Sequence, residues 1–401
     1  MYWDNLDKPW VRRLRTATRL ATGVDPAPAD EVVRTFASMY YDADPLAEAF
    51  VDEVYLGRSA AEGRAMLDRA IEGGVASVPD APASLVALFA DIETDPDWVD
   101  WERIDLGARV FRRWGTAVFR FAGSITLEGY SENSVVKPLI LTGVYTGGTT
   151  RHRFMETVAF WIAVSTANGL RPGGAGRASA LRVRVMHVFV RRRLMAHPEW
   201  DLGSWGVPIS QADATLTLMG GSILPGLGLN TIGYRTSIEE IEATLLFWRY
   251  IGHVMGVRPR WYPANYREAL QLMFLTVVKA ANRSGEDGAL LCTSYVDAFA
   301  PESTGMARLW EEWDHRQHVG YARFFLPRWS WKRAGLSQIG FLGAIPVLKA
   351  PFVFGAETLR RNLPGMETVA DRVIQRRRDR WFAHYMGNKK AEYRPVRDFT
   401  R

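Results

Sequence analysis

The stretch Arg151–Leu194 reads RHRFMETVAFWIAVSTANGLRPGGAGRASALRVRVMHVFVRRRL, and it decides the fold. Apolar residues recur at helical spacing on both sides of RPGGAG, Arg171–Gly176. Because proline and glycine interrupt helices, this pattern predicts two helices joined by a loop. Helical periodicity continues through most of the remaining chain, so the sequence predicts an all-α protein.

The two helices carry polar side chains that suggest a site. Arg153 and Thr157 are four residues apart and therefore share one helix face. His187 on the second helix lies among apolar positions, with Arg184 and Arg191 one turn away on either side. The residues alone leave two interpretations open. His187 is either a core histidine beside solvated arginines or an axial ligand of haem iron, with Arg184 and Arg191 near the haem propionates.

These motifs resemble the latex clearing protein (rubber oxygenase) family and the wider group of MpaB-type oxygenases. The first match is Arg153-Phe-Met-Glu-Thr157, followed thirty positions later by His187 within LRVRVMHVFVRRRL. The second is LLFWRYIGHVMGVRPRWYP, Leu245–Pro263, where the family carries W-R-Y-x-G, then G-V and a proline. The resemblance is good between positions 100 and 280 and loose at both ends.

The resemblance implies a globin-like helical core that encloses a b-type haem. It places the proximal, metal-binding ligand at His187 and the distal polar residues at Arg153 and Thr157. His253, in the second motif, is the runner-up ligand, and we favour a structural or hydrogen-bonding role for it.

The distal carboxylate is the least defined part of the implied site. The best-known rubber oxygenases carry a lysine just before the distal threonine, and this chain has Glu156 there. The family's distal base is expected on the helix before Arg153, where Glu128 and Glu132 are candidates. Glu156 itself is a third candidate for that role.

The implied function is a haem b-dependent oxygenase that combines dioxygen with an apolar, isoprenoid- or lipid-like alkene. The resemblance implies carbonyl products from oxidative cleavage of the double bond, and Glu156 leaves oxidation without cleavage and peroxidase-like turnover as open alternatives. Two alternatives belong to other classes. One is a haem-binding or haem-sensing protein without catalysis, and the other is a helical lipid- or partner-binding protein without haem.

Composition narrows the possible partners. The chain has 401 residues, with 50 Lys and Arg against 44 Asp and Glu, a net charge of +6. This mild excess is not a nucleic-acid signature, and we expect no nucleic-acid partner. A single cysteine, Cys292, excludes an intrachain disulfide and a thiolate metal cluster.

Two stretches of sequence indicate the cellular compartment and the relation of the protein to membranes. Residues 1–20 carry charges throughout and lack the apolar core of a signal peptide, so we expect a cytoplasmic protein. We expect no spanning helix, because no window of about eighteen residues is both apolar and uncharged. The apolar stretch 337–355, SQIGFLGAIPVLKAPFVFG, is a core hairpin, a channel wall or a surface for peripheral contact with membrane or lipid.

The predicted organisation has three parts. Residues 1–100 form an N-terminal helical extension, 101–335 the haem-binding oxygenase core, and 336–401 a C-terminal helical extension packed on that core. Within the core we expect one helix over Ile104–Phe121. A capping box of Ser237 and Glu240 starts another.

Two further segments invite chemical interpretations that we reject. Gly220–Gly233, GGSILPGLGLNTIG, contains G-x-G but follows no strand, so its glycines indicate close approach to a flat cofactor or another helix. The segment Glu311–His318 holds acids and histidines but only one Glu-x-x-His, Glu312 to His315. A di-iron site needs a second, so we interpret this segment as a solvated charged face.

Overall fold

The structure is a computed structural model that describes residues 7–143, 149–279, 283–337, 340–393 and 399. Within these ranges the chain is helical, with one isolated bridge between Glu132 and Arg283 and no strand, which confirms the all-α prediction. The α-helices of the described residues are α1 (Pro9–Thr22), α2 (Asp30–Ser38), α3 (Pro45–Phe50), α4 (Ala60–Gly73), α5 (Ala83–Glu93), α6 (Trp101–Arg113), α7 (Thr116–Gly129), α8 (Asn133–Leu141), α9 (Thr150–Ser165), α10 (Ala175–Met195), α11 (Leu202–Trp205), α12 (Gln211–Gly221), α13 (Ile223–Asn230), α14 (Ile238–Val254), α15 (Tyr266–Val278), α16 (Gly285–Asp297), α17 (Gly305–Phe325), α18 (Ala344–Asn362) and α19 (Met366–Met386).

The predicted pair of helices in Arg151–Leu194 is α9 and α10, which pack against each other. The loop between them includes Gly173 with φ 76°, a conformation that glycine adopts without steric cost. Gly176 stands in the first turn of α10, where a Cβ atom would overlap the backbone of Val164 on α9. The glycines of this loop therefore allow the two helices to meet closely.

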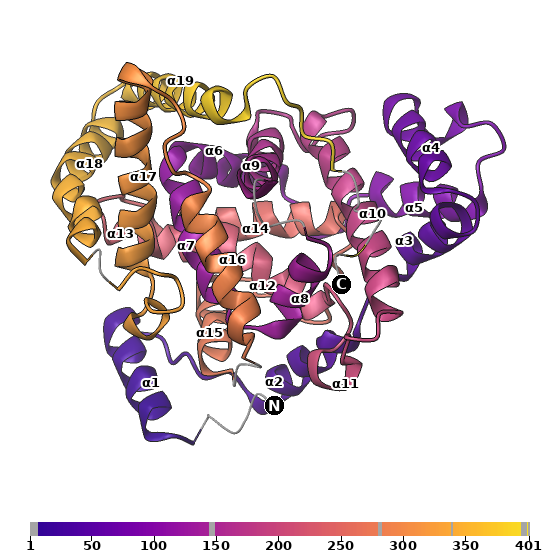
Figure 1. The fold of residues 1–401 in the computed structure, drawn as a ribbon, viewed down its shortest axis with the longest axis horizontal. Helices are drawn as coiled ribbons and strands as arrows, with labels where there is room; N and C mark the ends of the chain where they lie inside the picture. Colours follow the sequence, from indigo (N-terminus) through magenta and orange to yellow (C-terminus); the bar gives the residue numbers. More distant parts are fainter. Residues whose placement is uncertain (1–6, 144–148, 280–282, 338–339, 394–398, 400–401) are drawn as a thin grey trace.

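Helix α14 runs through the middle of the molecule and packs against α6 (Figure 1). At their contact, a Cβ on Gly107 would overlap the carbonyl oxygen of Ala243, so the two backbones touch. Helix α14 starts with the predicted capping box, because Ser237 accepts from the Glu240 amide while Glu240 accepts from the Ser237 amide. The central helix is thus fixed at its start and along one side.

One prediction about a helix boundary is wrong. The single helix expected over Ile104–Phe121 is broken between α6 and α7, where Gly115 has φ 55°, a value that ends a right-handed helix. The glycine-rich segment Gly220–Gly233 contains helix α13. Its glycines approach other helices, as one of the two interpretations expected, since a Cβ at Gly226 or Gly228 would overlap Ile241 or Phe121 respectively.

The N-terminal helices α3, α4 and α5 lie on one side of the molecule in Figure 1, and α17, α18 and α19 lie on the other. The largest cluster of buried apolar side chains in the described residues has members from Phe36 to Met386 along the sequence, including Phe247 of α14. All three predicted segments contribute side chains to this core. The predicted boundaries near residues 100 and 335 stay a prediction.

The interpretation of Glu311–His318 as a solvated face is wrong for the side chains that point inward from α17. Asp314 is buried, pairs with Arg120 of α7 and accepts hydrogen bonds from Trp381 Nε1 and Tyr385 Oη of α19, both at 2.9 Å. Burial raises the pKa of Asp314, but Arg120 and His318 outweigh it and hold the pKa well below its usual range. This carboxylate joins three helices.

Candidate functional site

His187 lies in the middle of α10, half-buried, and forms no hydrogen bond or ion pair with a residue in the described part of the chain. Burial lowers its pKa to about 4, and the cation of Arg191, one turn further on, lowers it too. At neutral pH the imidazole is therefore uncharged, which is the form that binds metal. The side chain has both the charge state and the available nitrogen that a haem ligand needs.

The polar residues predicted on the distal side lie together on α9. Arg153 Nη1 donates to Glu156 Oε2 at 2.7 Å, and Thr157 Oγ1 donates to the Arg153 carbonyl at 3.3 Å. Glu156 is buried, and its second oxygen accepts the backbone N–H of Glu392 at 2.9 Å. The structure thus joins the side chains of Arg153 and Glu156 and ties them to the C-terminal segment, while the Thr157 hydroxyl bonds the backbone of the same helix. We call these three residues the polar group around Arg153.

The two other candidate carboxylates have partners elsewhere. Glu128, near the end of α7, accepts hydrogen bonds from Ser330 and Arg333. Glu132, just before α8, lies 3.1 Å from Lys279 Nζ, and that ammonium has a raised pKa because Tyr40, Glu132 and Asp213 outweigh the effect of burial. Neither carboxylate is shown to contact the group around Arg153.

The two arginines that flank His187 on α10 are engaged with the protein. Arg184 is almost fully buried and holds Asp44 through two nitrogens at 2.8 and 2.9 Å, with Asp91 at 3.0 Å. Arg191 donates to the carbonyls of Pro208 at 2.9 Å and Ile209 at 2.6 Å. A propionate at Arg184 would meet two carboxylates already in place. The contacts of both arginines with haem propionates remain predictions.

A pocket that the sequence did not indicate lies beside α14. It has a volume of about 410 Å³ and is lined by Asp91, Thr94, Pro96, Trp98, Leu218, Arg249, His253, Val257, Arg258, Pro259 and Tyr262. His253 is buried there, and its Nε2 has no hydrogen-bond partner among the described residues. Burial and Arg258 lower the pKa of His253 to about 4. None of the residues around Arg153 or His187 lines this pocket.

The second motif, Leu245–Pro263, explains where this pocket comes from. The Arg249 guanidinium lies 4.2 Å from the ring centre of Trp98 and 5.4 Å from that of Tyr262, so aromatic faces hold it. Gly256 has φ 76°, and a Cβ there would overlap Asp44, the partner of Arg184. The motif therefore contributes part of the pocket wall and leaves room for a buried ion pair. The aromatic and arginine residues of this motif were the sequence signal that could have located the pocket.

Residues 108–343 match the family model described as "ER-bound oxygenase mpaB/B'/Rubber oxygenase, catalytic domain". The chain belongs to this family of oxygenases. The rubber oxygenase of Streptomyces sp. (strain K30) is 26% identical over 235 residues, which are 57% of this chain and 55% of that protein. The alignment thus spans little more than half of the length of this relative.

The fold is shared with a solved structure of the family. The structure of latex clearing protein LCP in the closed state superposes with a TM-score of 0.61, over 90% of this chain and 94% of the other, at 21% sequence identity. The resemblance inferred from Arg153, Thr157, His187 and the W-R-Y motif is therefore confirmed at the level of family and fold.

Proposed function

We propose that this protein is a haem b-dependent oxygenase that uses dioxygen to oxidise an apolar, isoprenoid- or lipid-like alkene, with cleavage of the carbon–carbon double bond. The observation that carries the proposal is His187, an uncharged imidazole without a partner in the described structure, in a chain of an oxygenase family. Its position, 34 residues after Arg153, is the spacing on which the resemblance rests.

The chemistry of His187 suits a haem ligand, because its imidazole is uncharged at neutral pH and has no partner among the described residues. His187 would hold the iron through one ring nitrogen, and α10 would supply the proximal wall. When bound, the haem supplies a redox-active iron for oxygen chemistry. Glu156 stands where the best-known relatives carry a lysine, and a carboxylate cannot act as an amine ligand. This chain therefore has no lysine at that position that could bind the iron.

The polar group on α9 would act on the reacting atoms. Arg153 provides a cation that stabilises negative charge developing on oxygen, and Thr157 provides a hydroxyl donor beside it. A carboxylate would accept a proton from the allylic carbon of the alkene, as a general base. We assign this role first to Glu156, because it lies 2.7 Å from Arg153. Glu132 and Glu128 are the second and third candidates.

Spectra test the haem assignment directly. We expect the purified protein to show a Soret band that shifts when dithionite and then carbon monoxide are added. The His187→Ala variant should lose bound haem, and His253→Ala, which removes the other candidate ligand, should keep it. Full haem occupancy in His187→Ala would disprove the ligand assignment. A colourless protein that stays colourless after haem is added would disprove the cofactor.

The main alternative is a haem-binding protein without catalysis, because Glu156 replaces the lysine of the best-known relatives. Measurements of oxygen consumption distinguish this alternative from an oxygenase. We expect alkene-dependent oxygen uptake, with carbonyl products, that falls at least tenfold in Glu156→Gln while the Soret band stays. Unchanged uptake in Glu156→Gln would move the base to Glu132 or Glu128. A haem protein without uptake on any apolar alkene would favour the non-catalytic alternative.

A further inference from the structure

Helix α18 has an outward face that is apolar and free of charge. Leu348 and Phe352, one turn apart, are 70% and 80% exposed, and Val347 and Leu359 are 50% and 52% exposed. Pro351 is exposed between them. Residues at these spacings share one side of a helix, so they form a continuous apolar stripe. We call this set the α18 stripe.

The opposite side of α18 is bound to the protein by its charged residues. Lys349 Nζ donates to Gln317 of α17 at 2.7 Å, and Arg361 Nη2 donates to Glu240 of α14 at 2.6 Å. The remaining two, Glu357 and Arg360, are buried and pair with each other at 3.1 Å. All four charged residues of α18 therefore have partners on the side away from the stripe.

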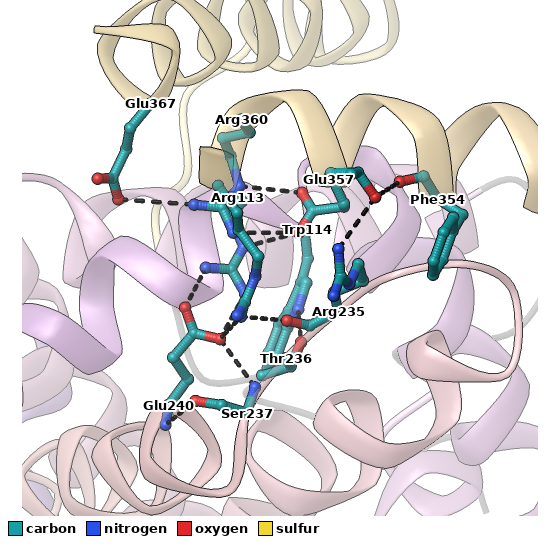
Figure 2. Close-up of polar contacts among 12 residues, drawn as sticks. Arg113, Trp114, Arg235, Thr236, Ser237, Glu240, Phe354, Glu357, Arg360 and Glu367 are labelled. Carbon is teal, nitrogen blue, oxygen red and sulfur yellow. Dashed lines mark hydrogen bonds and ion pairs between the residues drawn. The ribbon is translucent and has the colours of Figure 1, made fainter. Parts of the chain in front are cut away.

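A buried ionic group, shown in Figure 2, holds the C-terminal half of α18 on the core. Glu357 lies 3.7 Å from Arg113 of α6, and Arg113 in turn binds Glu240 through two hydrogen bonds of 2.6 and 3.1 Å. We call Arg113, Glu240, Glu357 and Arg360 the α18 latch.

The segment Gly340–Asn362 is long and apolar enough to cross a membrane, with mean hydropathy 1.3 over its most apolar window, of which 11% is buried. The segment is not free of charge, because Lys349 lies within its apolar stretch. Spanning a bilayer would expose Glu357, Arg360 and Arg361 to hydrocarbon or require the latch to break, and buried ion pairs are costly to break. The geometry favours a helix that lies flat on a surface.

Positive charge is concentrated in the part of the sequence that contains α18. Residues 323–380 contain 12 Lys and Arg against 4 Asp and Glu, a net charge of +8, whereas the whole chain has +6. The rest of the chain therefore carries a net charge of −2. Exposed cations stand on both sides of α18 in the sequence: Arg328 and Lys332 before it, and Arg372, Arg376, Arg377 and Arg380 after it.

We propose that α18 is a membrane-docking helix, whose stripe enters the interface of an anionic phospholipid bilayer while the flanking cations bind lipid headgroups. An apolar helix face bordered by Lys and Arg is the combination that binds such surfaces. A second copy of the chain is a poorer occupant, because facing stripes would bring two segments of +8 together. This inference does not depend on haem or on the proposed reaction.

Vesicle sedimentation tests the proposal with the full-length protein. We expect binding to vesicles of phosphatidylcholine with about 30% phosphatidylserine and much weaker binding to phosphatidylcholine alone. Raising the salt from about 0.1 M to about 1 M should weaken binding, since the Debye length shortens from about 10 Å to about 3 Å. A double change, Leu348→Ser with Phe352→Ser, should lower the partition coefficient roughly a hundredfold, about tenfold for each side chain.

Two controls make the outcome decisive. Leu20→Ser changes a side chain on α1 that is 82% exposed, and it should bind vesicles like the unmodified protein. Circular dichroism and thermal unfolding verify that each variant is folded. Equal binding by the double variant, or no binding to anionic vesicles by the unmodified protein, would overturn the proposal. A dimer in light scattering that the double variant abolishes would assign the stripe to a second copy instead.

Discussion

Removing the charge of Glu357 should loosen α18 from the core. In Glu357→Gln the shape of the side chain is kept, but the buried cations of Arg360 and Arg113 lose a carboxylate at 3.1 and 3.7 Å. Breaking a buried ion pair from one side costs about 3–5 kcal/mol. Since Arg113 keeps Glu240 and Arg360 keeps Glu367, we expect the lower end, about 3 kcal/mol, which is roughly a hundredfold in an equilibrium constant.

The measurement is amide hydrogen exchange, resolved by peptide, because α18 can open without global unfolding. Protection of the peptides covering Ala344–Asn362 should fall roughly a hundredfold in Glu357→Gln, whereas peptides from α9 and α10 should keep their rates.

Glu367 offers a matched control, because it pairs with the same arginine. Its oxygen lies 3.7 Å from Arg360 Nη1, but its side chain is 72% exposed, and ion pairs at the surface contribute about 0–1 kcal/mol. We expect Glu367→Gln to change α18 protection less than about fivefold. Equal effects of the two substitutions would show that burial of the latch does not determine how firmly α18 is held.

Four other substitutions probe the fold. Gly107→Ala should destabilise the protein by about 1–3 kcal/mol or more, because its Cβ would overlap Ala243, whereas Gly355→Ala, with open space around it, should stabilise it by up to about 1 kcal/mol; thermal unfolding distinguishes the two signs. Asp314→Asn should cost about 3–5 kcal/mol in urea unfolding, since Arg120 stays buried without a countercharge, and a loss below about 1 kcal/mol would contradict this. His253 binds its proton less tightly in the folded protein, with a pKa of about 4 against 6.5, so its contribution to stability is present above pH 6.5 and is lost as the pH falls towards 4. In His253→Gln, the slope of the unfolding free energy against pH between pH 4 and 6.5 should therefore decrease by about one proton. An unchanged slope would show that His253 is not the source of this pH dependence.

The sequence predicted the elements whose signals are local. Helical periodicity and the RPGGAG loop gave α9 and α10, and the spacing of Ser237 and Glu240 gave the start of α14. The motif around His187 indicated the family, and the structure adds that this histidine is uncharged and unpartnered among the described residues.

The failures share a physical cause, which is that partners distant in sequence decide them. Aspartate usually lies at the protein surface, and Asp314 can be buried only because Arg120 and α19 supply a countercharge and hydrogen-bond donors. The single helix expected over Ile104–Phe121 fails at Gly115, whose positive φ no apolar period reveals. Periodicity cannot carry this information, because it describes one segment at a time.

The hydrogen bond from the Glu392 amide to Glu156 also has a consequence for biosynthesis. The two residues are 236 positions apart, so at about 5–20 residues per second the ribosome adds Glu392 roughly 10 to 50 s after Glu156. During that interval the nascent α9 carries a carboxylate that lacks one of its final partners. The polar group around Arg153 is therefore completed only after the ribosome has added Glu392, long after the helix α9 that carries it has been made.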